Sequence, residues 1–298
     1  MTLNSRNILA FLYSHFLILT GKIKKIKKNA ANGDFILSVY FHNPSKKLFE
    51  FCTKWFLKNG FHFISVDELN QILNNKLPFP KSAVVFTVDD GWKANKDNIG
   101  TIAEKYSVPV TIFVSTNPVE NNEGYWWSYV SKGINFIDKK DNVSTLKKVP
   151  NEYRLEIVEE IKSKIIIKDE ALSVDELKEI SLNPNITIGS HTISHPILTM
   201  CADVFSKNEI QHSKLKIEHW ISKDVKYFAF PNGEFSEREI NYLKESGYEL
   251  AFSTVPKYIT KDNLPDKYIL PRFDILESVS FTENICRMTG AWFNKSIF

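Results

Sequence analysis

The sequence predicts an α/β fold: a single distorted (β/α)7-type barrel with a helical, aromatic-rich insertion. Two observations predict it. Short apolar runs alternate with segments of helical periodicity along most of the chain. Several of those runs are followed directly by polar residues of the kinds that carry chemistry, which is typical of the carboxyl ends of barrel strands.

The composition is that of an ordinary folded protein with a full-sized core. The chain has 298 residues, of which 43% are hydrophobic and 24% charged. A net charge of +3 is too small to predict nucleic-acid binding. The five lysines of residues 22–28 account for more than this charge, so the rest of the chain is slightly acidic. Cys52, Cys201 and Cys286 form no CxxC pair, so neither a thiolate zinc site nor a disulfide framework is expected.

We expect residues 1–33 to form an apolar and basic segment ahead of a barrel domain over residues 34–298. The apolar stretch 8–19 is shorter than the about 20 residues that span a bilayer. Its lysines follow it, and no signal-peptide cleavage site is evident. We favour peripheral membrane contact through residues 8–28 at the cytoplasmic face. The alternatives are a packing helix followed by a solvated basic loop, and an uncleaved export signal that would place the protein in the cell envelope.

The first half of the barrel begins with "FILSVYFH" at residues 35–42, an apolar run that predicts a buried strand. Phe49, Cys52 and Phe56 then recur at helical spacing. Further strands are expected at 61–64, 83–88 and 108–115, and helices at 48–59, from Ser65 or Asp67 onward, and at 98–106.

The alternation breaks at about residues 117–180, which we interpret as an insertion between strands. It holds the aromatic stretch "GYWWSYV" and two predicted helices, at 151–165 and 173–182. Strands are again expected at 186–191, 225–231, 250–255 and 268–275, with helices at 201–221 and 236–248.

The polar residues at the predicted strand ends contain the parts of a mononuclear metal hydrolase. They are His42, Asp89 with Asp90, His191 with His195, Pro231 with Asn232, and Arg272. Because the carboxyl ends of barrel strands open on one face, we expect these side chains to converge there.

The two histidines of "GSHTISHP" are four residues apart. On a helical turn, this spacing puts the imidazoles of His191 and His195 on one side. Imidazole is a common ligand of zinc-type metals, and a carboxylate is a common third ligand. An HxxxH pair alone usually binds nothing, so the interpretation depends on carboxylates from elsewhere.

Those carboxylates are the paired acids of "VVFTVDDGW". Neighbouring residues that leave a strand point in different directions, so one of Asp89 and Asp90 can bind a metal while the other accepts a proton from water. Alone, Asp-Asp-Gly would be read as a helix cap or a turn. Together with HxxxH it predicts a metal site.

"VVFTVDDGW", "GSHTISHPIL" and "FAFPNGEFS" resemble the leading motifs of the polysaccharide deacetylases, carbohydrate esterase family four, over about residues 35–275. The resemblance implies that Asp89 is the general base. It implies that Asp90, His191 and His195 hold a divalent metal, with zinc expected and cobalt or nickel as alternatives. It also implies that the backbone N–H of Asn232, which follows Pro231, helps to hold the oxyanion.

Three features depart from the usual family pattern, the first being Val88, which stands where the family has a phenylalanine before the two acids. Ala229 stands where the third motif often has an arginine that braces the base. Arg272, in "LPRF", is similar to a residue of a subgroup, and we expect it to orient or charge-balance Asp89; a surface arginine is the alternative.

The usual late histidine acid is also absent, because no histidine follows His219. "SVYFHNP" resembles the opening motif of a circularly permuted subgroup, typified by exopolysaccharide poly-N-acetylglucosamine deacetylases. This implies that His42 protonates the departing amine. The alternative is an ordinary core histidine.

The expected reaction is removal of N-acetyl groups from an amino sugar of a polysaccharide or lipid-linked saccharide. Trp92, and less so Trp126 and Trp127, are candidates for stacking on a sugar, the alternative being core packing. The same site could serve a deformylase or another amide or ester deacylase. Ala229 also leaves open a catalytically impaired glycan-binding protein.

Overall fold

The computed structural model describes residues 5–293, and its central feature is a ring of parallel strands. Six of them are hydrogen-bonded in the order β7-β6-β5-β4-β3-β1. They are β1 (Phe35–Phe41), β3 (Ala83–Val88), β4 (Val110–Val114), β5 (Ile186–Ser190), β6 (Tyr227–Ala229) and β7 (Leu250–Phe252). This parallel arrangement follows from strands that alternate with helices along the chain.

Residues 270–274 close the ring as a seventh strand. Within them, β9 (Phe273–Asp274) pairs in parallel with β1, and Leu270 forms a parallel bridge to Phe252 of β7. Neither end strand of the row is therefore left as a free edge. The two-residue strands β2 (His62–Phe63) and β8 (Ile259–Thr260) pair outside the ring with β3 and β1. The predicted distorted (β/α)7-type barrel is confirmed.

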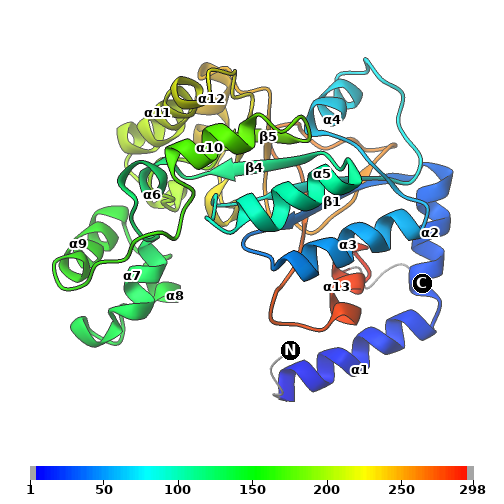
Figure 1. Ribbon diagram of the computed structural model, residues 1–298, viewed down its shortest axis with the longest axis horizontal. Helices are drawn as coiled ribbons and strands as arrows, with labels where there is room; N and C mark the ends of the chain where they lie inside the picture. The colour runs from blue at the N-terminus through cyan, green and yellow to red at the C-terminus, as the bar shows by residue number, and fades with distance from the viewer. Residues whose placement is uncertain (1–4, 294–298) are drawn as a thin grey trace.

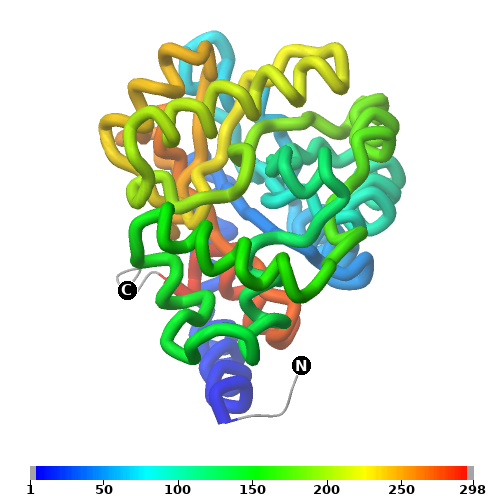
Figure 2. The backbone as a smooth tube through the Cα atoms, turned by 90° about the vertical axis from the view of Figure 1, so that its left-hand side faces the viewer, coloured from blue at the N-terminus to red at the C-terminus, as the bar shows by residue number. Residues whose placement is uncertain are grey.

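Helices surround the ring, as Figures 1 and 2 show. They are α3 (Lys46–Lys58), α4 (Val66–Leu73), α5 (Thr101–Tyr106), α10 (Val174–Ser181), α11 (Asp203–Ile221), α12 (Glu237–Glu245) and α13 (Phe281–Met288). Most begin at a serine whose hydroxyl accepts a backbone N–H of the first turn, as Ser65, Ser173 and Ser236 do. These caps satisfy donors that a helix leaves unpaired and explain where the helices begin.

The core has two layers, one on each side of the strands. Alternate residues of β1 and β3 enter different clusters: Ile36 and Val85 join one, and Leu37 and Val84 join the other. This follows from the two-residue period of a strand. It also explains why both strands are almost entirely apolar, with one hydroxyl residue each at Ser38 and Thr87, since each strand is buried on both faces.

The insertion forms a separate lobe, drawn in green in Figure 1. It contains α7 (Trp126–Lys132), η2 (Ile134–Phe136), α8 (Val143–Leu146) and α9 (Asn151–Lys162). The two ends of the expected insertion at 117–180 belong to the barrel instead, because α6 (Thr116–Asn121) and α10 contribute Val119, Leu177 and Ile180 to the main core. Trp126, Tyr129 and Val158 of the lobe lie in a small apolar cluster of its own. Among residues 5–293, the insertion adds no strand to the barrel.

At the N-terminus, α1 (Ser5–Leu19) and α2 (Lys22–Asn32) are joined at Gly21. The lysines of residues 22–28 are helical, so the alternative of a basic loop is wrong. None of the helices in the described part of the chain is long and apolar enough to cross a membrane.

Candidate active site

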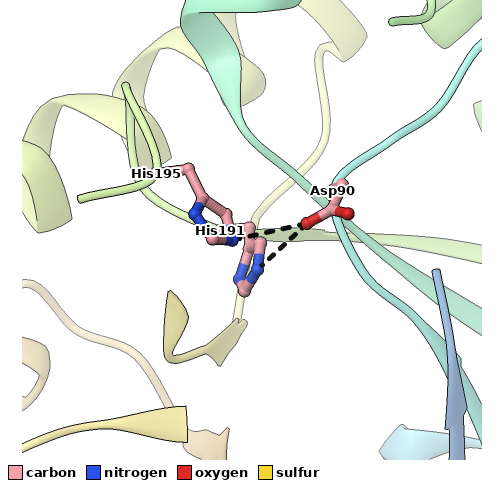
Figure 3. Close-up of side chains that lie close together, drawn as sticks. All are labelled: Asp90, His191 and His195. Atoms are coloured by element: carbon pink, nitrogen blue, oxygen red, sulfur yellow. Dashed lines mark ion pairs between the residues drawn. The ribbon is translucent and has the colours of Figure 1, made fainter. Parts of the chain in front are cut away.

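Asp90, His191 and His195 converge at the carboxyl ends of β3 and β5 (Figure 3). Their ligand atoms lie within 4.8 Å of one another, and all three residues are buried. The Nε2 atoms of His191 and His195 are 3.5 and 3.4 Å from Asp90 Oδ1. These contacts are longer than ordinary hydrogen bonds.

The donor set fits a divalent metal. Asp90 Oδ1 is buried and has no hydrogen-bond partner within residues 5–293. A buried carboxylate oxygen without a partner is unfavourable, and a cation between it and the two imidazoles would satisfy it. One carboxylate with two histidines also leaves coordination positions for water and substrate.

Neighbouring groups orient the candidate ligands. The Ala229 carbonyl lies 2.7 Å from His191 Nδ1, which fixes the proton there and leaves the Nε2 lone pair toward Asp90. Trp92 Nε1 donates to Asp90 Oδ2 over 2.8 Å, so Oδ1 alone remains for an ion. Burial lowers the pKa of His195 to about 4, which keeps its imidazole neutral, as metal binding requires.

The backbone at these residues differs from the expected helical turn. Asp90, Thr192 and His195 have φ values of 78°, 68° and 53°, in the left-handed region. Residues 191–195 form a loop, so the prediction that helical spacing aligns the two imidazoles is wrong. Glu209 holds this loop by accepting the N–H groups of residues 193 and 194. Such strain is unfavourable in itself and is often found at functional sites.

Asp89 is held by Arg272. The guanidinium donates from Nη1 to Oδ1 over 2.7 Å and from Nη2 to Oδ2 over 2.8 Å. Both side chains are buried, so the alternative of a surface arginine is wrong. Burial alone would raise the pKa of Asp89, but the charge and hydrogen bonds of Arg272, together with the charges of His191 and His42, outweigh it and hold that pKa below its usual value. Asp89 is therefore an anion at neutral pH.

A cavity of about 450 Å³ opens over these groups and includes most of the other predicted site residues. His42 is exposed on its wall, with its ring edge-to-face on Tyr40. Asn232 also lines it, at φ 58° within η4 (Pro231–Gly233). Pro231 is buried at the start of η4, and within the described residues it is not part of the cavity wall.

Trp92 lines the cavity, but its contacts differ from those of a sugar-stacking platform. Its ring packs against Tyr125 at 4.4 Å, while its N–H is bonded to Asp90. This hydrogen bond was not expected from the sequence, although the two-residue spacing of Asp90 and Trp92 could have suggested it.

Residues of the insertion contact the site directly. From the sequence, Trp126 and Trp127 are expected mainly to pack in the core, and nothing singles out Lys147 or Arg154. Trp126 Nε1 and Arg154 Nη1 donate to the His195 carbonyl over 3.0 and 3.2 Å. The Trp127 ring meets the His195 ring edge-on at 4.6 Å. Lys147 lines the cavity and donates to Asn232 Oδ1 over 2.9 Å. No local pattern links these residues to the motifs, because their contacts exist only in the folded chain.

Comparison with known proteins gives a consistent picture. A family model described as polysaccharide deacetylase matches residues 76–251. YxkH of Bacillus subtilis strain 168, which is named as a polysaccharide deacetylase, is 21% identical over 217 residues. That match covers 73% of this chain and 61% of YxkH, so the chain spans about three-fifths of that relative.

Solved structures share the fold at low sequence identity. The Streptococcus pyogenes deacetylase PplD, solved in complex with acetate, has a TM-score of 0.60 and 18% identity, covering 86% of this chain and 97% of PplD. IcaB from Ammonifex degensii has a TM-score of 0.61 and 16% identity, with the same coverage. These likenesses establish the architecture around the site.

Proposed function

Because the chain belongs to the polysaccharide deacetylase family, we propose that it is a metal-dependent hydrolase that removes N-acetyl groups from an amino sugar of a glycan. One observation carries the proposal above the others. Three potential metal ligands, from Asp90, His191 and His195, lie beside the Asp89–Arg272 ion pair and line the same cavity as Asp89.

The proposed metal ligands are Asp90, His191 and His195, and zinc is the metal we favour because two imidazoles and a carboxylate suit it. A divalent ion held there would acidify a water molecule and polarise the acetyl carbonyl. The residues around it support the assignment, since the Ala229 carbonyl and the Trp92 N–H fix the orientation of two ligands.

Asp89 is the proposed general base. It adjoins Asp90 in the chain, lines the same cavity and is anionic, so it can accept the proton of the attacking water. Ala229 stands where the third motif often has an arginine and so carries no charge. Arg272 supplies that positive charge instead, and it donates to both carboxylate oxygens of Asp89. This contact speaks against an impaired binder, because the brace missing from the third motif is supplied from another strand.

His42 and Asn232 are proposed to complete the reaction from the cavity wall. His42, at the end of β1, donates a proton to the departing nitrogen as the carbon–nitrogen bond breaks, releasing acetate and a free amine. The backbone N–H of Asn232 donates to the oxyanion of the tetrahedral intermediate. Trp127 adds aromatic surface against which a sugar ring can pack.

The test is acetate release. Protein loaded separately with zinc, cobalt or nickel is incubated with N-acetylated oligosaccharides, and acetate and new amines are assayed. Replacing Asp89 by Asn should lower the rate by about 10²–10⁴-fold while leaving the bound metal unchanged, since Asp89 acts on the proton. Asp224→Asn, at an exposed site, is the matched control and should keep full activity.

The outcomes separate the alternatives. Full activity of Asp89→Asn would contradict the assignment of the base. Release of formate from N-formyl sugars, or of acetate from O-acetyl esters only, would assign another acyl group to the same site. A protein that binds glycans but releases neither acid under any metal would be a glycan-binding protein.

A further inference from the structure

Helix α1 carries most of its large apolar side chains on the face that points to solvent. Five of them recur at spacings of one, three and four residues and so form a stripe along one side of the helix. Their exposed fractions are 47% for Ile8, 67% for Leu9, 60% for Leu12, 58% for Phe16 and 85% for Leu19. A continuous apolar surface of this kind is uncommon on a soluble protein and marks an interaction site.

The opposite face of α1 packs on the barrel through small and polar residues and through Leu17. Asn7, Ala10, Ser14 and Leu17 are buried, and the Ser14 hydroxyl donates to that of Thr282 on α13. The Arg6 guanidinium forms an ion pair with the buried Glu283, at 2.7 Å. These polar contacts fix the rotation of α1 about its own axis. The packing of the helix on the barrel therefore determines that the apolar stripe faces solvent.

The charge next to this stripe has one sign. Residues 1–33 contain Arg6 and five lysines, and no acidic residue. On α2, Lys24, Lys25 and Lys28 are exposed, while Ile23, Ile26 and Ala30 face the core. Figure 1 shows α1 along the lower edge of the molecule and α2 rising from its end at the right.

We propose that the stripe of α1 and the exposed lysines of α2 form a docking surface for an anionic lipid bilayer. An apolar stripe beside basic residues is the pattern of a helix that lies in the headgroup region, with the apolar side chains immersed and the lysines on anionic headgroups. A second copy of the chain is disfavoured, because a symmetric contact through this face would bring two cationic segments together. The surface serves binding at the cytoplasmic leaflet, which is the anionic one.

The inference goes beyond the deacylation chemistry and can be tested apart from it. The 298-residue chain is sedimented with vesicles of phosphatidylcholine alone or with 30% phosphatidylglycerol added. We expect binding to the anionic vesicles that weakens in 0.5 M NaCl. Leu12→Glu/Phe16→Glu should lower the partition coefficient by at least roughly 100-fold, because two apolar side chains no longer enter the lipid. Lys24→Gln/Lys28→Gln should lower it by roughly 30-fold.

Matched controls are available elsewhere on the surface. Leu182 and Val204 are 75% and 73% exposed, and Leu182→Glu/Val204→Glu should pellet as the wild type does. Lys139→Gln/Lys257→Gln changes two lysines at exposed positions. It should lower the partition coefficient onto anionic vesicles much less than Lys24→Gln/Lys28→Gln does. Hydrolysis of a soluble oligosaccharide should be equal in all these variants, so a loss of binding is distinguishable from a failure of the active site.

Three results would overturn the proposal. Failure of the wild type to bind anionic vesicles at low salt would exclude the bilayer as the partner, and so would undiminished binding by Leu12→Glu/Phe16→Glu. The third result is a dimer, detected by light scattering, that Leu12→Glu/Phe16→Glu dissociates while no vesicle binding is seen. The stripe would then be covered by a second copy of the chain.

Discussion

Arg272 determines the protonation of the proposed base. Its guanidinium lies inside the barrel, over the ring of Tyr40, and bonds both oxygens of Asp89 and the Thr87 hydroxyl. A base held this firmly stays ionised at acid pH, but it also accepts a proton less readily than one with a pKa near neutrality. The Asp89–Arg272 ion pair therefore fixes the position of the base and keeps it ionised over a wide pH range, but it makes Asp89 a weaker base.

We predict that Arg272→Met raises the pH at which activity is lost on the acid side. Burial raises the pKa of Asp89, and Arg272 is the strongest influence that lowers it. Without the guanidinium, only the effects of His191 and His42 oppose burial, so the pKa should rise. The base must be ionised, so the acid limb of the kcat/KM profile should move to higher pH. Activity at neutral pH should fall as well.

Arg272→Lys is the matched control for this prediction, because it keeps the charge and loses the two-pronged contact. Its acid limb should move less than that of Arg272→Met. Thermal melts of both variants are needed beside the kinetics, since a buried carboxylate without its partner destabilises a fold by about 3–5 kcal/mol. An acid limb identical in the wild type and both variants would mean that Asp89 is not the group that titrates.

At the scale of elements, the turns after β3 and β5 are where the sequence is hardest to interpret. Strands β1 and β3 were predictable because each is almost entirely apolar. The structure shows capping boxes at Ser65 and Ser173, where the helices were expected to begin. The loop at His191 was not predictable, because Thr192 and His195 adopt a left-handed backbone that Glu209 and the insertion stabilise from a distance. The local pattern predicted which residues meet but not the backbone that brings them together.

The turn after β3 gives a prediction at this scale. Gly91 has φ +84°, and a Cβ there would lie 3.0 Å from Val114 Cγ1 on β4. Gly91→Ala should therefore displace the neighbouring Asp90 and lower both metal affinity and stability, the latter by about 1–3 kcal/mol. Isothermal titration with zinc and a urea melt measure the two effects.

Gly247→Ala separates the two causes, because Gly247 has φ +73° and a Cβ added there would meet no atom of residues 5–293 within 4 Å. It should show the backbone strain alone, without loss of metal affinity. Val114→Ala placed on Gly91→Ala should restore part of the affinity by making room. If Gly247→Ala weakens zinc binding as much as Gly91→Ala does, the contact with Val114 is not what matters.

At the scale of the whole molecule, the site joins segments that are distant in the chain. Asp89 and Asp90 follow β3, the histidines follow β5, and Arg272 lies on the segment that closes the ring between β7 and β1. The order of strands around the ring brings these segments to one end, so the predicted barrel was sufficient to predict their convergence. The contacts of Trp126 and Arg154 with His195 were beyond sequence reasoning, because they depend on how the inserted lobe packs on the barrel.

Because the proposed ligands come from different parts of the barrel, removing the metal should lower the stability of the whole domain. A ligand present at 100 times its Kd stabilises the folded state by about 2.7 kcal/mol, which for a chain of 298 residues corresponds to roughly 4 °C in Tm. Excess EDTA should therefore lower the Tm of zinc-loaded protein by that amount, and added zinc should restore it.

The control is His191→Gln/His195→Gln, which should melt at one temperature with or without EDTA. An equal EDTA shift in that variant would place the stabilising metal elsewhere, and no shift in zinc-loaded wild type would mean that Asp90 and the two histidines do not couple an ion to folding.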